Sequence, residues 1–288
     1  MIAPTPTPFV WKPVPSPGPV TLRGRTVTLE PLSAESHAAE FWQAVRGHDE
    51  LWTWLFESPC ATESDLRRAI EQKQAARAAV FLAIVPAETG RAAGWASYMR
   101  MEPAHGVVEV GSILFSPSLQ RTTAATEAMY LMASHVFDHL GYRRYEWKCN
   151  AQNLPSRRAA ERLGFTFEGI FRQHMVIKGK SRDSAWFSML DSEWPARKRA
   201  FEIWLEPANF DSEGRQIKSL RNTSPRALCC PIPDRVNEER SRASEPGISP
   251  RLRWTRTRVR ELRWLCARLA HHRQSPRKLP SPGSRSGR

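Results

Sequence analysis

The stretch at residues 109–128, which reads EVGSILFSPSLQRTTAATEA, decides the fold. Apolar residues up to Phe115 are typical of a β-strand, Ser116-Pro117 ends the strand, and small residues open a helix at about Thr122. The first amide groups of a helix have no partner within the helix, so they can bind an anion. Small side chains let a phosphate approach these amides, and Arg121 adds positive charge. The stretch predicts a diphosphate site, although such loops also contain small residues for packing alone.

Patterns on both sides of this stretch predict a mixed α/β fold. Ser33 and Thr62 are suitable helix N-caps, and Gly141 and Gly164 are suitable helix stops. Helices between strands favour parallel pairing, so we expect one central mixed sheet flanked by helices. The expected strands are 20–32, 80–85, 92–101, 107–115, 143–150, 167–177 and 184–190, and the expected helices are 33–47, 62–78, 122–140, 156–163 and one after Trp194-Pro195.

Composition divides the chain of 288 residues into three parts. Residues 1–19 contain seven prolines, which favour an extended and unpacked arm. Residues 20–220 form the expected domain. Residues 221–288 hold 17 of the 43 Lys and Arg but only 5 of the 29 Asp and Glu, so the net charge of +14 belongs mostly to a tail that we expect to be disordered. The basic composition is therefore no evidence that the domain itself binds nucleic acid.

Within the tail, residues 251–273 carry apolar side chains at roughly heptad spacing among arginines. A basic helix of this kind could contact RNA, an acidic partner or a membrane surface. The alternatives are a disordered arginine-rich extension and an out-of-frame translation.

The spacing of the cysteines and the hydropathy of the sequence help to predict the cellular compartment. The five cysteines show neither zinc-site spacing nor the density of a disulfide scaffold, and the eight histidines form no metal-binding motif. No run of about 18 apolar residues predicts a membrane span, and prolines occupy the place of a signal-peptide helix. We expect a cytoplasmic protein without a metal.

Several further motifs, in matching order and separation, resemble those of the GNAT superfamily, in particular the Rim-type branch that acetylates the N-termini of ribosomal proteins. The resemblance covers about residues 20–220 and implies a single GNAT-like domain. It also implies an acetyl-coenzyme A-dependent N-acetyltransferase that acts by direct attack of a primary amine, either a protein N-terminus or a small molecule. The matching elements are Glu109-Val110-Gly111, Ser116-Pro117, 120–125, Thr126-Glu127-Ala128, Asn153-Leu154-Pro155-Ser156 and Leu163-Gly164-Phe165.

The resemblance also implies which residues bind coenzyme A. Thr123 stands where the family has a central loop glycine, and a threonine there would be strained if the loop needs positive φ. Asn153 matches the residue that binds the pantetheine arm, or it is a plain turn residue. The implied set is Leu114, Phe115, Gln120, Arg121, Thr122, Thr123, Ala124, Ala125, Thr126 and Asn153.

Acyl transfer requires a neutral amine, which is about one molecule in a thousand for a lysine-like amine at pH 7. Glu109 matches a family position for the general base, with a structural strand carboxylate as the alternative. The tyrosine that many relatives use as an acid falls on Ala160. Ser156 is therefore the candidate to stabilise the leaving thiolate, with a helix N-cap as the alternative. The resemblance also implies that a backbone amide near Leu114 stabilises the oxyanion of the reaction.

Among the aromatic residues, Trp54 and Trp95 are our candidates for an acceptor pocket, although such residues are more often core. Cys149 is expected to be a buried strand residue and His174 to be exposed or packed. Two other functions stay open. A degenerate domain could bind acyl-coenzyme A without turnover, or the tail could make the protein an RNA- or ribosome-associated factor.

Overall fold

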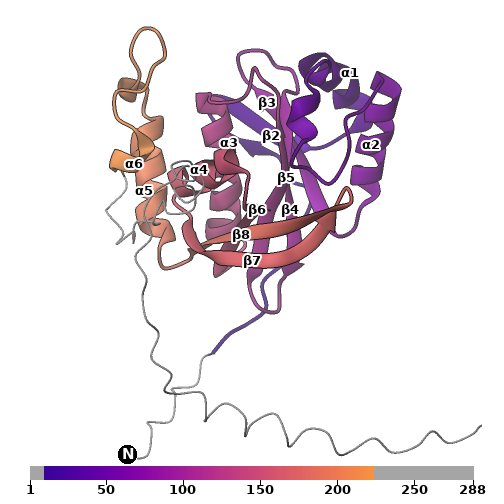
Figure 1. Cartoon of the computed structure of the whole chain (residues 1–288). Helices are drawn as coiled ribbons and strands as arrows, with labels where there is room; N and C mark the ends of the chain where they lie inside the picture. Colours follow the sequence, from indigo (N-terminus) through magenta and orange to yellow (C-terminus); the bar gives the residue numbers. More distant parts are fainter. Residues whose placement is uncertain (1–9, 224–288) are drawn as a thin grey trace, which may run out of the picture. The chain divides into compact units, whose positions relative to one another are not determined.

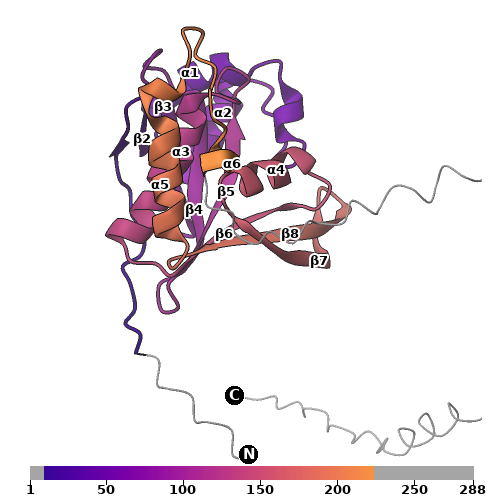
Figure 2. The same cartoon turned by 90° about the vertical axis from the view of Figure 1, so that its left-hand side faces the viewer.

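The computed structural model describes residues 10–223, which form an eight-stranded mixed sheet with helices on both faces (Figures 1 and 2). The strand order is β1-β2-β3-β4-β5-β6-β8-β7. Strands β5 and β6 are parallel and the other neighbours are antiparallel, which confirms the expected fold class. The strands are β1 (Leu22–Arg23), β2 (Val27–Pro31), β3 (Ala79–Pro86), β4 (Gly94–Glu102), β5 (Val107–Phe115), β6 (Arg144–Asn150), β7 (Thr166–Ile177) and β8 (Lys180–Leu190).

The helices cover the two faces of the sheet unequally. Helices α1 and α2 pack together on one face over the first half of the sheet, while α3 and α5 lie on the other face (Figures 1 and 2). The helices are α1 (Ala34–Val45), α2 (Glu63–Ala75), α3 (Thr123–Ser134), α4 (Leu154–Arg162), α5 (Trp194–Leu205) and α6 (Leu220–Thr223). Short helical segments are η1 (Asp49–Trp52), η2 (His135–His139) and η3 (Pro207–Asn209).

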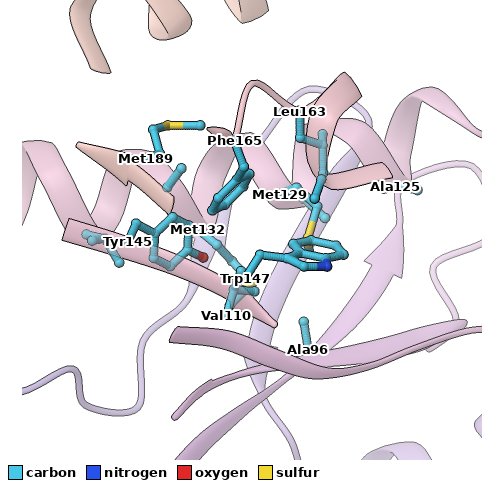
Figure 3. Packing of buried hydrophobic residues seen from close by; sticks show 14 of the residues in the cluster. Ala96, Val110, Ala125, Met129, Met132, Tyr145, Trp147, Leu163, Phe165 and Met189 are labelled. Atoms are coloured by element: carbon cyan, nitrogen blue, oxygen red, sulfur yellow. The ribbon is translucent and has the colours of Figure 1, made fainter. Parts of the chain in front are cut away.

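The larger hydrophobic core lies between the sheet and α3. Figure 3 shows Val110 of β5 and Tyr145 and Trp147 of β6 gathered with Met129 and Met132 of α3. Side chains alternate between the faces of a strand, so this apolar set occupies one face only. The opposite face of β5 and β6 is left for other side chains.

The first expected strand is interrupted. Residues 20–32 form the short hairpin of β1 and β2, because the backbone turns at Arg25 and Thr26. The carboxylate of Glu127, on α3, accepts hydrogen bonds from the backbone amides of Arg25 at 2.8 Å and Thr26 at 2.6 Å. A buried partner from a distant helix therefore breaks a pattern that reads as one continuous strand.

Local signals for the ends of helices are confirmed. The hydroxyl of Ser33 accepts from the amide of Ser36, and Thr62 forms a capping box with Asp65. Gly141 follows η2, which continues α3, and it takes a φ of 74°, a left-handed conformation that suits a helix stop.

Part of the proline-rich segment contacts the domain. The indole nitrogen of Trp11 donates to the carbonyl of Ala104 at 2.8 Å, and the amide of Val14 donates to the carbonyl of Pro103 at 3.1 Å. Residues 10–19 therefore lie against the turn between β4 and β5. The basic segment at 251–273 lies outside the described residues. None of the helices in residues 10–223 has the length and apolar character that a membrane span requires.

Candidate active site

A cavity opens where the two parallel strands separate. Strands β5 and β6 pair only from Val107 to Val110 and from Arg144 to Trp147, and then continue apart to their ends. The cavity has a volume of about 820 Å³ including its open mouth. Its walls come from β4, β5, β6, the start of α4, the turn after η1 and the β7–β8 hairpin. The loop that begins at residue 116, and the helix α3 after it, follow the end of β5 where the two strands are apart.

A β-bulge shapes the β5 wall of the cavity. Between Gly111 and Leu114, which pair with β4, the two residues Ser112 and Ile113 face the single residue Ala96. Ser112 has a φ of 48°, and both bulge residues line the cavity. Because β6 has already separated, neither neighbouring strand pairs with them. The side chain of Leu114, by contrast, is buried against α1 and α2.

Glu109 lies in the cavity wall and is only 5% exposed. Its Oε2 atom forms ion pairs with Arg100 Nε at 3.0 Å and with Lys148 Nζ at 3.0 Å. Burial raises the pKa of Glu109, and the charges of Lys148 and Arg100 partly oppose that rise. A carboxyl group with a raised pKa in a cavity can accept a proton near neutral pH more readily than an exposed one.

Charges of alternating sign extend from Glu109 across the sheet. Lys148 Nζ also lies 2.6 Å from Glu146 Oε2 and 3.8 Å from the centre of the Trp186 ring. Arg144 continues the row by pairing with Glu146 at 2.7 Å and with Glu168. Arg144, Glu146 and Lys148 point to the face of β6 that is opposite to Tyr145 and Trp147. Each buried charge in this row is therefore paired with a charge of the opposite sign.

Ser156 is placed so that its hydroxyl group can donate a proton, and the sulfur of Cys149 is one acceptor within its reach. The indole nitrogen of Trp147 donates to Ser156 Oγ at 3.0 Å, and an indole N–H can only donate. The hydroxyl group therefore accepts this bond and keeps its own proton for another acceptor. Cys149 is 6% exposed, as expected for a strand cysteine, and burial raises the pKa of its thiol while the hydrogen bond with Ser156 opposes that rise.

Asn153, and not Ser156, caps α4. The side-chain oxygen of Asn153 accepts from the amide of Ser156 at 3.1 Å, so the N-cap interpretation of Ser156 is wrong. The side-chain amide nitrogen of Asn153 has no hydrogen-bond partner among the described residues, and Asn153 lines the cavity. It is therefore available to a ligand.

The expected diphosphate loop lies at the beginning of α3 and outside the cavity wall. Thr122 is the N-cap and accepts from the amide of Ala125, while the amides of Thr123 and Ala124 bond to no group in residues 10–223. Positive φ falls on Arg121, at 63°, so Thr123 does not carry the strain that its sequence position suggested.

The remaining residues of that loop have structural partners. The side chain of Gln120 donates to the carbonyl of Phe115 at 3.1 Å. The hydroxyl of Thr126 donates to the carbonyl of Thr122 and accepts from Arg162 Nη1 at 3.1 Å. Arg162 thus brings a positive charge to the first turn of α3, which the loop sequence alone does not reveal.

The two tryptophans expected in an acceptor pocket lie in different places. Trp54 is 38% exposed and lines the mouth of the cavity. The expectation for Trp95 is wrong, because it is 2% exposed in the core beside Phe41, with ring centres 4.6 Å apart. The β7–β8 hairpin instead contributes His174 and Arg182 to the cavity wall.

The comparisons with known proteins agree with this fold. The family model described as "Acetyltransferase (GNAT) domain" matches residues 26–166. The solved structure of a GCN5-related N-acetyltransferase from Brucella melitensis is 50% identical, covers 74% of this chain and 97% of its own chain, and gives a TM-score of 0.73. This chain belongs to the GNAT acetyltransferase family. The enzyme class expected from the sequence, an acetyl-coenzyme A-dependent acyltransferase, is the class of this family.

Two curated relatives from Bacillus subtilis are more distant GNAT-family matches. The uncharacterized N-acetyltransferase YnaD is 27% identical over 86 residues, which is 30% of this chain and only half of the length of YnaD. YdaF, whose provisional name is ribosomal N-acetyltransferase, is 24% identical over 179 residues, or 59% of this chain and 92% of YdaF. Within residues 10–223 of the GNAT chain, His, Cys, Asp and Glu form no group of three or more that could hold a metal ion.

Proposed function

We propose that this protein transfers an acetyl group from acetyl-coenzyme A directly to a primary amine in the cavity between β5 and β6. The observation that carries the proposal is the meeting of Glu109, the bulge at Ser112 and the hydroxyl group of Ser156 in one cavity. These are a proton acceptor, backbone donors and a hydrogen-bond donor for sulfur. Acyl transfer to an amine needs those three groups.

The described residues fit coenzyme A along this opening. A pantetheine arm is an extended chain with two amides, and the unpaired edge of β5 beyond Val110 offers backbone groups to such a chain. The free amides of Thr123 and Ala124 at the beginning of α3 suit its diphosphate, with Arg121 and Arg162 as nearby cations. When bound, acetyl-coenzyme A supplies the thioester.

The chain's own residues then carry protons and charge. Glu109 accepts the proton that the amine loses as its nitrogen bonds to the acetyl carbon. The amides at Ser112 and Ile113 donate to the carbonyl oxygen as negative charge develops on it. Ser156 donates its hydroxyl proton in a hydrogen bond to the sulfur as the carbon–sulfur bond breaks, because Trp147 already occupies one acceptor position of that hydroxyl.

The acceptor is proposed as a protein N-terminus or a small-molecule amine. The provisional name of YdaF supports a ribosomal N-terminus, and the motifs that resemble the Rim-type branch point the same way. An α-amine with a pKa near 8 is about one-tenth neutral at pH 7, so it needs less help from a base than a lysine side chain does. A cavity with a single carboxylate therefore suits an α-amine better.

A thiol-release assay over a panel of amines, combined with calorimetric titration of acetyl-coenzyme A, tests the proposal. We expect wild-type protein to bind acetyl-coenzyme A and to release thiol with at least one amine. Ser156→Ala should lower kcat about tenfold to a hundredfold, the cost of one hydrogen bond to a charged group, without changing acetyl-coenzyme A affinity. The matched control is Ser64→Ala, an exposed serine on α2, which should leave both quantities unchanged.

The titration also separates the rival functions. Binding of acetyl-coenzyme A without turnover on any amine would favour a non-catalytic acyl-coenzyme A protein. Salt-dependent RNA binding that is lost on truncation at residue 220 would favour the RNA-associated function.

A further inference from the structure

Arg182 of β8 is a buried cation that no carboxylate of the described residues contacts, although the charge of Glu109 acts on it from a longer distance. Its relative exposure is 8%, it lines the cavity, and it forms no ion pair with any carboxylate in residues 10–223. Its Nε atom is fully buried without a hydrogen-bond partner in that part of the chain. Its guanidinium carbon lies 5.4 Å from the centre of the Phe56 ring.

A guanidinium group is costly to bury without an anionic partner. One contact with an aromatic ring offsets only part of that cost. The nearby thiol of Cys149 is no substitute, because burial raises its pKa and keeps it neutral. Asp183, the next residue on the strand, points to the opposite face of β8, where its side chain accepts from the amide of Gln173 at 2.7 Å. The missing partner of Arg182 therefore belongs to a ligand.

The other cations of the cavity differ from Arg182. Lys148 is held between Glu109 and Glu146, and Arg100 is paired with Glu109. His174 forms a hydrogen bond with the hydroxyl of Ser184 at 2.9 Å. Burial lowers the pKa of His174, and the positive charges of Arg100, Arg182 and Lys148 lower it further. The cavity thus holds one carboxylate, already neutralised, and an excess of positive charge.

This inference rests on the proposed function. We propose that the acceptor is a primary amine that also carries an anionic carboxylate or phosphate group, and that Arg182 binds this anionic group while the amine faces Glu109. A carboxylate fits the planar fork of a guanidinium group with two parallel hydrogen bonds. A phosphate has the same chemistry. Free amino acids and acidic N-terminal peptides belong to this class, whereas polyamines and aminoglycosides do not.

The position of Arg182 separates this site from the coenzyme. Arg182 lies on the same face of β8 as Ser184 and Trp186, opposite to Ala185 and Phe187 in the main core with α3. The diphosphate candidates at the beginning of α3 are not part of the cavity wall that contains Arg182. We therefore expect substitution of Arg182 to alter the choice of acceptor and to leave acetyl-coenzyme A binding unchanged.

The proposal is tested on the full-length protein with pairs of acceptors in which one member carries the anionic group and the other lacks it. The pairs are an amino acid and its amide, an N-terminal Ser-Asp peptide and its Ser-Asn counterpart, and phosphoethanolamine with O-methyl ethanolamine. For each pair, kcat/KM is corrected for the neutral fraction of the amine, and the dissociation constant of acetyl-coenzyme A is measured alongside. The variants are Arg182→Met, Arg182→Lys and Arg182→Glu, with Lys180→Met as the matched control at an exposed position of the same strand.

We expect wild-type protein to favour the anionic member of at least one pair by about 30-fold or more, as for a buried charge pair. Arg182→Met should bring the ratio to about one, Arg182→Lys should restore part of it, and Arg182→Glu should reverse it. Lys180→Met should keep the wild-type ratio. The pair with the largest ratio of kcat/KM values tells whether the anionic group of the acceptor is a carboxylate or a phosphate.

Two results would overturn the inference while leaving the proposed function intact. The first is equal kcat/KM for both members of every pair with wild-type protein, which needs no variant to fold. The second is a uniform loss over all acceptors in Arg182→Met together with weaker acetyl-coenzyme A binding, which would assign Arg182 to the coenzyme. A wild-type protein that acetylates none of the amines would instead overturn the proposed function, and this inference with it.

Discussion

The two faces of β5 and β6 are made by the same short segments of sequence and yet differ in most of their side chains, with Trp147 as the residue that both packs in the core and reaches Ser156 in the cavity. On one face, Val110, Tyr145 and Trp147 pack against α3 (Figure 3). On the other, Glu109 and Lys148 belong to a row of paired charges beside a cavity. The period of two in a β-strand allows this division, so that stability and chemistry can be encoded in adjacent residues. Substitutions on the two faces should therefore affect different quantities.

The largest effect is expected on the charged face. Glu109→Gln should lower kcat about 10²- to 10⁴-fold, the typical contribution of a positioned general base. The affinity for acetyl-coenzyme A should change little, since the amide has nearly the same shape, while the melting temperature should fall because the buried charge of Lys148 loses one of its two carboxylate partners. Stopped-flow thiol release and calorimetry measure the two quantities. Full activity in this variant would reject Glu109 as the base.

The apolar face should respond in stability and not in chemistry. Phe187 of β8 is fully buried, with its ring centre 5.2 Å from that of Phe167. Phe187→Ala should lower the free energy of unfolding by about 3–5 kcal/mol, as expected for a buried aromatic residue. The control is Val176→Ala on β7, 76% exposed, which should change it by less than about 0.5 kcal/mol. Urea unfolding of each variant measures the difference, and equal losses would contradict the division of faces.

Asn153 offers a smaller and more selective test, because it has both a capping oxygen and a free amide nitrogen. Asn153→Asp keeps a good N-cap but removes the donor, so stability should be kept while KM for acetyl-coenzyme A rises about tenfold, the value of one or two hydrogen bonds. Asn153→Ala should add a loss of about 1 kcal/mol in stability. An unchanged KM in both variants would limit Asn153 to capping.

The smallest effect concerns pH. Lys148 lowers the pKa of Glu109, so Lys148→Met should raise that pKa further. The plot of log kcat/KM against pH should have a slope of one where only the amine titrates, and a slope of two below the pKa of Glu109. The break between the two slopes should move to higher pH in Lys148→Met and disappear in Glu109→Gln. A break that does not move would show that Lys148 does not act on the base.

Sequence patterns predicted those features that depend on neighbours in the chain. The caps at Ser33 and Thr62 and the stop at Gly141 each arise from a few adjacent residues. The order of strands and helices followed from the same local patterns. The meeting of Glu109 and Ser156 in one cavity followed from the motif order, and their chemical roles stay predictions.

Features that depend on residues distant in the chain could not be predicted. The break between β1 and β2 is caused by Glu127, about a hundred residues away. The alternation of polar and apolar residues along the strand did not tell on which face of the sheet Trp95 lies, and its side chain is buried in the core. Arg182 reads as one more polar residue of a hairpin strand, and its burial without a contacting carboxylate among the described residues emerges only when β8 lies beside β6.

Hydrogen–deuterium exchange of the full chain, with and without acetyl-coenzyme A, tests the central claim most directly. If the coenzyme lies along the unpaired part of β5 with its diphosphate on α3, exchange should slow at residues 111–115 and at Thr123 and Ala124, and stay unchanged in β2 and β3. Tight binding of acetyl-coenzyme A with no slowing at these amides would contradict the account.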